Sequence, residues 1–369
     1  MMTNLTEAIL VPRPLRIEAG AGAFVATPGT RVLPVPSGGE GVAEALLRDL
    51  SEACGAGHLC SPGGRIELVC GPPEGASPEA YTLTVSRDLV TIKASDVRGL
   101  FMGRATLRQL LIQGGGVVPC GRIADSPAFA HRGYMLDVSR SKVPSMDTLL
   151  ALIEWLSQLK YNHFQIYIEH AFAYRNHRTV WENASPFTAE EIRRIDAFCR
   201  ERFIGFVPNQ NSLGHMEQWL RHPGYASLAE CPEGFQDPWT PDWRTPCTLS
   251  PVLPGSLDLM EELYAELLPN FSGALFNVGC DEPFELGRGL SGGECGKRGK
   301  GRVYLDWLLA LRRLCKGHGR RMLFWADIIN EHPELVAELP KDMIPLEWGY
   351  EKGHPWDEHC ACFAGAGLS

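Results

Sequence analysis

Two adjacent carboxylates follow an apolar segment in the second half of the chain. Residues 273–284 are Gly-Ala-Leu-Phe-Asn-Val-Gly-Cys-Asp-Glu-Pro-Phe, so a strand-like stretch ends in Asp281 and Glu282. Neighbouring carboxyl groups can divide acid and base work when their surroundings separate their pKa values. An Asp-Glu dipeptide by itself is common on solvated loops. The apolar lead-in and the Gly279-Cys280 turn favour a functional pair.

The segments around this pair alternate between short apolar strands and amphipathic helices. Ser145 precedes an apolar helical stripe, and Thr188 to Glu191 has capping-box spacing. We predict strands at 133–138, 163–168, 204–208, 274–279, 322–326 and 344–348, and further helices near 257–268 and 303–315. This alternation indicates a parallel sheet, either open and doubly wound or closed as a (β/α)8 barrel. No G-x-G-x-x-G motif follows a predicted strand, so the barrel is favoured.

The first part of the chain has the pattern of a small α+β unit. Residues 81–86 and 89–94 predict a hairpin, and 43–53 and 99–112 have helical spacing. Three glycines at 114–116 and prolines at 119 and 127 mark a boundary. We therefore expect an α+β domain over residues 1–120 and an α/β TIM-type barrel over 125–369.

Only six strands are predicted after residue 130, whereas a closed barrel has eight. We expect the chain to be truncated before the last strands, the alternative being two strands hidden in unassigned loops. Residues 222–255 contain seven prolines with Trp239 and Trp243. A long βα loop of this kind is expected on the active-site face of a barrel.

Composition excludes several classes of protein. Hydrophobic residues make up 44% of the chain and charged residues 21%, as in ordinary globular proteins. The net charge of -9 disfavours nucleic acid or an anionic membrane as a partner. No apolar run is long enough to span a bilayer, and the start lacks a secretory pattern, so we expect a cytoplasmic location. The 12 cysteines are scattered without a C-x-x-C pair, which predicts reduced thiols and no structural zinc site.

These motifs together resemble the family 20 glycoside hydrolases, the β-N-acetylhexosaminidases. The family has a strand-ending pattern of His or Asn, any residue, Gly, any residue, Asp, Glu, which Asn277, Gly279, Asp281 and Glu282 match. Other matching segments are 81–83, 99–111, 131–137, 161–163, 214–215 and 324–327. The resemblance implies an exo-acting enzyme that removes terminal β-linked GlcNAc or GalNAc from oligosaccharides or glycoconjugates, with no cofactor and no metal.

The resemblance also implies the mechanism. The 2-acetamido oxygen of the sugar would attack its own anomeric carbon to form an oxazolinium ion, with retention of configuration. Asp281 would accept the acetamido N–H and stay ionised. Glu282 would protonate the leaving oxygen and then deprotonate water, for which we expect a raised pKa.

Further site residues follow from the same resemblance. Arg132 matches an arginine that binds hydroxyls of the terminal sugar, although a surface salt bridge is the alternative. His215 matches a histidine near the acid. The family's Asp-Asp pair after the second strand is replaced here by Glu169 and His170. One of them takes over the hydrogen bond to His215, or that link is absent.

Three aromatic residues are candidates for the pocket wall. Trp325 matches a tryptophan that shields the oxazolinium from water. Trp348 and Tyr350 are weaker candidates for the same wall and for a phenol donor, and either could be core. The segment Pro208 to His215 departs from the family pattern, which affects substrate range more than reaction type. The alternatives are a relative that releases a disaccharide or modified sugar, and a non-catalytic sugar-binding protein.

Overall fold

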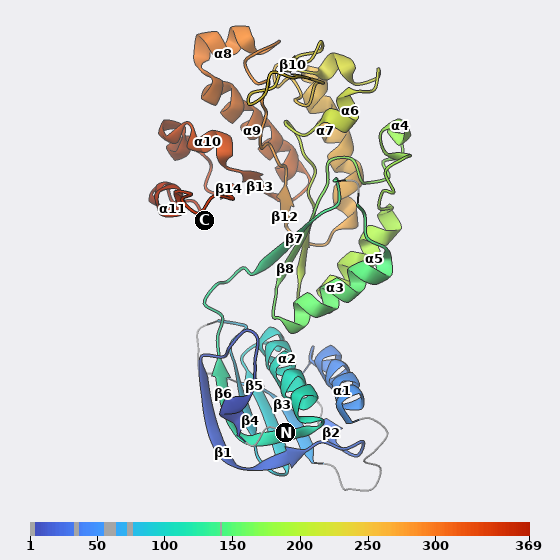
Figure 1. Cartoon of the computed structure of the whole chain (residues 1–369), viewed down its shortest axis with the longest axis vertical. Coiled ribbons are helices and arrows are strands. Elements are labelled where there is room, and N and C mark those ends of the chain that lie inside the picture. The colour runs from blue at the N-terminus through green and yellow to red at the C-terminus, as the bar shows by residue number, and fades with distance from the viewer. Residues whose placement is uncertain (1–3, 33–36, 55–63, 72–76, 141) are drawn as a thin grey trace. The chain divides into compact units, whose positions relative to one another are not determined.

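The chain folds into two compact units. The structure, a computed structural model, describes residues 4–32, 37–54, 64–71, 77–140 and 142–369 (Figure 1). The first unit comprises Met1–Tyr134, Leu149–His163 and Phe198–Ile204, and the second comprises Met135–Thr148, Phe164–Ala197 and Gly205–Ser369. Within the described ranges every cysteine is a free thiol, in agreement with the prediction. None of the helices in these ranges is long and apolar enough to cross a membrane.

The first unit is built on a six-stranded mixed sheet. Its strands are β1 (Arg16–Val25), β2 (Arg31–Val32), β3 (Arg65–Cys70), β4 (Tyr81–Val85), β5 (Leu89–Ala94) and β6 (Val117–Asp125), in the order β1-β6-β4-β5-β3-β2. The predicted hairpin is β4 and β5, which pair antiparallel with Leu83 opposite Ile92. Strand β6 pairs with β1 and β4 as far as Asp125, so this sheet continues past the boundary expected at residue 120.

Two helices accompany this sheet, namely α1 (Glu40–Cys54) and α2 (Val97–Gly114), preceded along the chain by the short 3-10 helix η1 (Leu5–Glu7). Helix α2 begins after Asp96, whose side chain accepts the N–H of Arg98, and ends at Gly115 in the left-handed conformation (φ 58°). It packs on strands β3 to β6, and α1 packs beside it (Figure 1). A Cβ at Gly103 would lie 2.5 Å from Ile92, so the helix approaches the sheet closely.

The second unit contains the six predicted strands of the barrel-type domain. They are β7 (Gly133–Asp137), β8 (His163–Tyr167), β9 (Gly205–Val207), β12 (Leu275–Asn277), β13 (Arg321–Trp325) and β14 (Ile344–Leu346). They form two three-stranded sheets, β7-β8-β9 and β12-β13-β14, and the latter is parallel. An isolated parallel bridge between Asn209 and Asn277 links β9 to β12. The six strands therefore follow one another in chain order.

Helices alternate with these strands, as the sequence predicts. They are α3 (Met146–Gln158), α4 (Arg178–Trp181), α5 (Ala189–Arg200), α6 (Glu217–Leu220), α7 (Pro254–Leu267), α8 (Gly292–Arg298), α9 (Lys300–Gly317), α10 (Asp327–Asn330) and α11 (Trp356–Gly365). The predicted capping box precedes α5, where Thr188 and Glu191 bond reciprocally. Tyr304, Leu308, Leu311 and Cys315 form a buried stripe on α9.

The remaining elements are short. They are β10 (Phe235–Gln236), β11 (Trp243–Arg244), η2 (Ala226–Leu228), η3 (Leu268–Asn270) and η4 (Pro333–Glu338). Strands β10 and β11 pair antiparallel within the long predicted loop at 222–255. Residues of this loop that pack inward form a small apolar cluster of Cys231, Phe235 and Cys247, with Phe284 against it. The loop is thus a folded insertion.

A buried ion pair joins α1 to α2. Two nitrogens of Arg104 donate to the two carboxylate oxygens of Asp49 at 2.5 Å each, and the two side chains are 5% and 2% exposed. We predict that Asp49→Asn lowers the free energy of unfolding by about 3 kcal/mol, because it leaves a buried guanidinium without a carboxylate. Urea denaturation followed by circular dichroism measures this.

The control for this prediction is Glu18→Gln, which removes the same charge from an exposed pair. Glu18 and its partner Arg16 have side chains 42% and 66% exposed. We expect a loss below about 1 kcal/mol there. Equal effects of the two substitutions would contradict the assigned role of the buried pair.

Candidate active site

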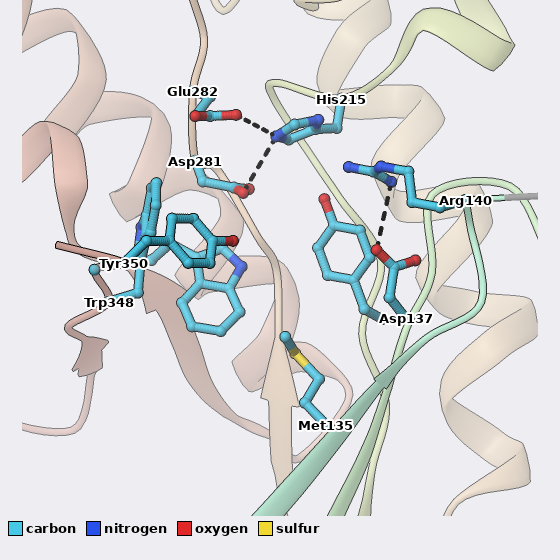
Figure 2. A pocket seen from close by; sticks show the side chains of 11 residues that line it. Met135, Asp137, Arg140, His215, Asp281, Glu282, Trp348 and Tyr350 are labelled. Atoms are coloured by element: carbon cyan, nitrogen blue, oxygen red, sulfur yellow. Dashed lines mark ion pairs between the residues drawn. The ribbon is translucent and has the colours of Figure 1, made fainter.

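A pocket of about 420 Å³ lies in the second unit (Figure 2). It is lined by Met135, Asp137, Arg140, Tyr167, His215, Asp281, Glu282, Trp325, Trp348, Gly349 and Tyr350. Most of these residues belong to the last residues of a strand or to the segment that follows it. The carboxyl ends of the strands are the face on which barrel enzymes place their sites.

The paired carboxylates lie on a tightly bent turn after β12. Gly279, Cys280 and Glu282 have positive φ angles of 70°, 72° and 46°. For residues other than glycine, this conformation costs about 1–3 kcal/mol each. The turn is held by Asn277, whose Oδ1 accepts the Gly279 N–H at 2.9 Å, and by Asp327, whose Oδ2 accepts the Glu282 N–H at 2.9 Å. The bend directs both carboxylates toward the pocket (Figure 2).

The segment containing His215 packs directly against this turn. A Cβ at Gly214 would collide with the carbonyl oxygen of Asp281, so only glycine allows this approach. His215 itself has a positive φ of 57°. As a result, the imidazole lies beside the two carboxylates instead of pointing away from them.

His215 is surrounded by three carboxylates. Its Nε2 lies 3.3 Å from Asp281 Oδ2 and 3.3 Å from Glu282 Oε2 (Figure 2). Its Nδ1 lies 3.4 Å from Glu169 Oε1. Glu169 therefore provides the link to His215 that the sequence left open between Glu169 and His170. Both ring nitrogens face acceptors, which the doubly protonated imidazolium satisfies.

The pKa values follow from these contacts. Burial disfavours the imidazolium, but the hydrogen bonds to Asp281 and Glu282 outweigh it and raise the pKa of His215 to about 10. The hydrogen bond from His215 lowers the pKa of Glu282, and burial only partly opposes it. The expectation of a raised pKa for Glu282 is therefore wrong for the unliganded site. The resemblance placed His215 near the acid, but the 3.3 Å contact that lowers the pKa of Glu282 depends on the fold.

Two further acids have raised pKa values. Burial, with Asp281 nearby, raises the pKa of Asp327 to about 7. Burial also raises the pKa of Glu169, against the opposing charges of Arg140 and His215. The buried Oδ1 of Asp281 has no hydrogen-bond partner among the described residues. Asp281 also lines the pocket, so a donor on a bound molecule that reached this oxygen would satisfy it.

Arg140 brings a cation to the opposite side of the pocket. Its Nη1 donates to Glu169 Oε1 at 2.6 Å and lies 3.8 Å from Asp137 Oδ2, and the guanidinium stands 5.5 Å from the ring centre of Tyr167 (Figure 2). A guanidinium has five N–H donors, so others remain for a ligand. The site therefore offers donors and acceptors on facing sides.

Arg132, predicted as the sugar-binding arginine, does not line this pocket. It precedes β7, and its Nη2 donates to Glu79 Oε2 at 2.5 Å while its Nε donates to the Lys160 carbonyl at 2.9 Å. Both partners belong to the first unit, as Arg132 does. The residue stands at the amino end of its strand, whereas the pocket lies at the carboxyl ends.

One other expectation also differs from the structure. His170 is not among the pocket residues; burial lowers its pKa, and its Nδ1 has no hydrogen-bond partner among the described residues. The 222–255 loop contributes none of the described lining residues, but it contacts the segment that follows Glu282, where the ring centres of Trp239 and Phe284 lie 4.8 Å apart. The charge of Arg244 in this loop also contributes to lowering the pKa of Glu282.

All three predicted aromatic residues line the pocket. Trp325 ends β13, and Trp348 and Tyr350 follow β14 with ring centres 5.5 Å apart. The indole N–H of Trp325 is buried without a hydrogen-bond partner among the described residues, whereas the indole of Trp348 lies against the Asp327 carboxyl and interacts with it. Tyr350 is 90% exposed, so it forms an open edge. None of the three belongs only to the core.

The residues that the sequence analysis missed carry a recognisable signal. Met135 and Asp137 are two positions apart on β7 and so share one face, and Tyr167 ends β8. Arg140 comes three residues after the end of β7. Asp137, Tyr167 and Arg140 could have been found by searching the carboxyl end of every predicted strand for polar or aromatic residues, whereas Met135, an apolar residue within β7, could not. Asp327, which holds the Glu282 backbone, follows β13 in the same way.

The fold and site define a class of protein. Acidic and aromatic side chains at the carboxyl ends of successive barrel-type strands, around a small pocket, are typical of barrel glycoside hydrolases. The model of glycosyl hydrolase family 20, domain 2, matches residues 7–126, and that of the family 20 catalytic domain matches residues 129–359. The chain belongs to glycosyl hydrolase family 20.

Known relatives agree with this assignment. The chain is 25% identical to a beta-hexosaminidase of Vibrio furnissii over an alignment of 389 positions, covering 94% of this chain and 60% of that protein. It superposes on a family 20 exo beta-N-acetylglucosaminidase of Vibrio harveyi with a TM-score of 0.78 at 21% identity, covering 100% of this chain and 61% of that one. It also superposes on a chitobiase of Flavobacterium johnsoniae with a TM-score of 0.75 at 24% identity. That alignment covers 92% of this chain and 55% of the chitobiase. These neighbours confirm a TIM-barrel-like fold with an N-terminal domain, and the chain spans about 60% of their length.

The raised pKa of His215 predicts how stability depends on pH. A pKa raised from 6.5 to about 10 means that protonation favours the folded state. This contribution is complete below about pH 6.5 and is lost as pH rises toward 10. We predict that His215→Gln flattens the decline in unfolding free energy over this range, which amounts to a few kcal/mol in the parent.

Chemical denaturation at a series of pH values measures this decline. His131→Gln, which replaces an exposed histidine, is the control and should keep the slope of the parent. If His215→Gln also keeps that slope, the imidazole is not held charged by the carboxylates.

Proposed function

We propose that the second unit carries the catalytic site of an exo-acting β-N-acetylhexosaminidase that removes terminal β-linked GlcNAc or GalNAc with retention. The buried, unpartnered Oδ1 of Asp281 beside Glu282 is the observation that carries this proposal. A pocket of about 420 Å³ suits one sugar residue rather than a long chain. Closure of the strands into an eight-stranded barrel and a cytoplasmic location belong to the same proposal.

Asp281 orients the substrate's own nucleophile. Its free Oδ1 accepts the N–H of the 2-acetamido group, which directs the acetamido oxygen toward the anomeric carbon. An internal nucleophile held in this way has an effective molarity of about 10⁵–10⁸ M. The negative charge of Asp281 also offsets the positive charge that develops on the oxazolinium ring. The indoles of Trp325 and Trp348, which line the pocket, shield this ring from water.

Glu282 gives a proton to the glycosidic oxygen and later takes one from water. His215 is the neighbouring group that holds the proton in the free site. In the free site the proton resides on His215, 3.3 Å from Glu282 Oε2. Sugar binding expels water and brings the leaving oxygen to Glu282, which favours the protonated carboxyl over the ion. The proton that Glu282 gives to the leaving oxygen then comes from His215, which is the neighbouring group that carries one in the free site.

Arg140 and Asp137 bind the far side of the sugar. They face Asp281 and Glu282 across the pocket (Figure 2). The guanidinium donors that Glu169 does not occupy bind ring hydroxyls, and the Asp137 carboxylate accepts from them. When Arg140 and Asp137 bind these hydroxyls, the non-reducing end of the substrate points into the pocket. This orientation limits cleavage to the terminal sugar.

Substitution of the two carboxylates tests the mechanism. We predict that Glu282→Gln lowers turnover of substrates with poor leaving groups by about 10²–10⁴-fold and spares activated aryl glycosides, because only the former need the acid. Asp281→Asn should slow both kinds of substrate. Rates measured on chitobiose and on a dinitrophenyl GlcNAc glycoside separate the two roles.

A thiazoline mimic of the bicyclic intermediate provides the second readout. It should bind the parent protein far more tightly than GlcNAc does, and Asp281→Asn should abolish the difference. Near-normal rates in Asp281→Asn, or equal affinity of the parent for the mimic and GlcNAc, would contradict substrate assistance.

The two arginines provide a further test. We predict that Arg140→Ala lowers kcat/KM by at least about 10-fold through lost hydroxyl contacts, whereas Arg132→Ala keeps kcat/KM per folded molecule and lowers thermal stability. Steady-state kinetics and thermal unfolding of both variants measure this. The reverse result would return the sugar-binding role to Arg132.

A further inference from the structure

Glu347, His354 and His359 form a compact cluster outside the carboxylate site. Their potential ligand atoms all lie within 4.8 Å of one another. Glu347 Oε1 lies 2.5 Å from His354 Nε2 and 2.7 Å from His359 Nδ1. The first residue follows β14, the second lies in the following loop, and the third lies in the first turn of α11. Three separate segments therefore converge on one carboxylate oxygen.

The carboxylate of this cluster is buried without a permanent cation. The Glu347 side chain is 8% exposed, and its partners among the described residues are the two histidines and the amide of Asn330. No lysine or arginine in the described ranges forms an ion pair with it. Residues 347–359 contain four acidic residues and one lysine, so the local charge is also negative. A buried carboxylate in such surroundings is stabilised by a bound cation.

The hydrogen bonds around His359 leave a conflict. Its Nδ1 faces an acceptor, Glu347 Oε1 at 2.7 Å, and also a donor, the Asn330 amide nitrogen at 3.2 Å. One ring nitrogen satisfies only one of these. If Nδ1 carries the proton, that N–H points at the N–H of the Asn330 amide. If Nδ1 is unprotonated, its lone pair points at the negatively charged Glu347 carboxylate. A cation between Nδ1 and the carboxylate would remove this repulsion between the lone pair and the carboxylate.

We propose that Glu347, His354 and His359 bind one divalent transition-metal ion, with Zn²⁺ the best match. Two imidazole nitrogens and one carboxylate oxygen are a ligand set that zinc uses in proteins, with the fourth position left to water. Bonds of about 2.0–2.1 Å place tetrahedral ligands about 3.3 Å apart. The two histidine nitrogens, now 2.5 and 2.7 Å from Glu347 Oε1, would each have to move away from that oxygen by about 0.6–0.8 Å to reach this spacing. Asn330, bonded to Glu347 Oε2 at 2.5 Å, orients the carboxylate from outside.

Such an ion would fix one wall of the pocket. Glu347 directly precedes Trp348, and a Cβ at Gly349 would collide with the His354 ring, so the cluster packs against the backbone of the wall. The ion ties both ends of the 347–354 loop to α11. This proposal does not depend on the proposed function, because it concerns metal binding by the folded chain.

Metal titration of the purified full chain tests the proposal. After treatment with a chelator, calorimetry should show one equivalent of Zn²⁺ bound, and Co²⁺ should give the visible spectrum of a tetrahedral site without a thiolate band. We expect His359→Ala and Glu347→Gln each to weaken binding by at least about 10-fold. Zinc should raise the midpoint of thermal unfolding of the parent and not of these variants.

Two matched controls separate this site from incidental binding. Cys360→Ser removes an exposed thiol next to His359, and His131→Ala removes an exposed histidine of the first unit. Both should bind zinc like the parent. Circular dichroism confirms that each variant is folded, and Glu347→Gln keeps the shape of the side chain. Absence of stoichiometric binding, unchanged affinity in both cluster variants, or loss of binding in Cys360→Ser would overturn the proposal.

Discussion

The candidate active site depends on a close approach of two backbone segments. Gly214 lies against the carbonyl of Asp281 with no space for a side chain between them. This contact places the next residue, His215, beside the Asp281 and Glu282 carboxylates. The strained turn on the other segment directs those carboxylates inward. Without this close approach, the His215 imidazole would lie too far from Asp281 and Glu282 to neutralise either carboxylate.

Four acids, Asp281, Glu282, Glu169 and Asp327, share the described site with the cations His215 and Arg140, and the charge of Arg244 also acts on Glu282. Burial and contact act differently on three of these acids. Glu282 is the acid whose pKa is lowered by His215, whereas burial raises the pKa of Glu169 and brings that of Asp327 to about 7. Asp327 nevertheless keeps a fixed task, because its Oδ2 accepts the Glu282 N–H whatever the state of its other oxygen. Charge at the reacting end is thus set by burial and contact and not by composition.

The sequence predicted the framework better than the electrostatics. Period and spacing located all six strands of the second unit, the β4–β5 hairpin and the capping box at Thr188, because each is encoded within a short segment. Asp281, Glu282, His215 and Trp325 followed from motifs at strand ends. Arg132 is wrong as the sugar-binding arginine because it stands at the amino end of β7, whereas Arg140, which the sequence analysis did not name, follows the carboxyl end of that strand and lines the pocket. The pKa of Glu282 depends on a residue 67 positions away, so no local pattern contains it.

The loop after β14 holds an exposed aromatic side chain, Tyr350, in an ordered segment. Tyr350 is 90% exposed, and an exposed aromatic side chain on a free loop would lose most of its binding energy to the cost of ordering. Here the loop is anchored at both ends, by Glu347 at its start and by His354 at its close, and these anchors bond to each other at 2.5 Å. The short segment between them has few conformations left. An exposed edge of the pocket can therefore still be ordered, provided that the contacts between Glu347, His354 and α11 persist.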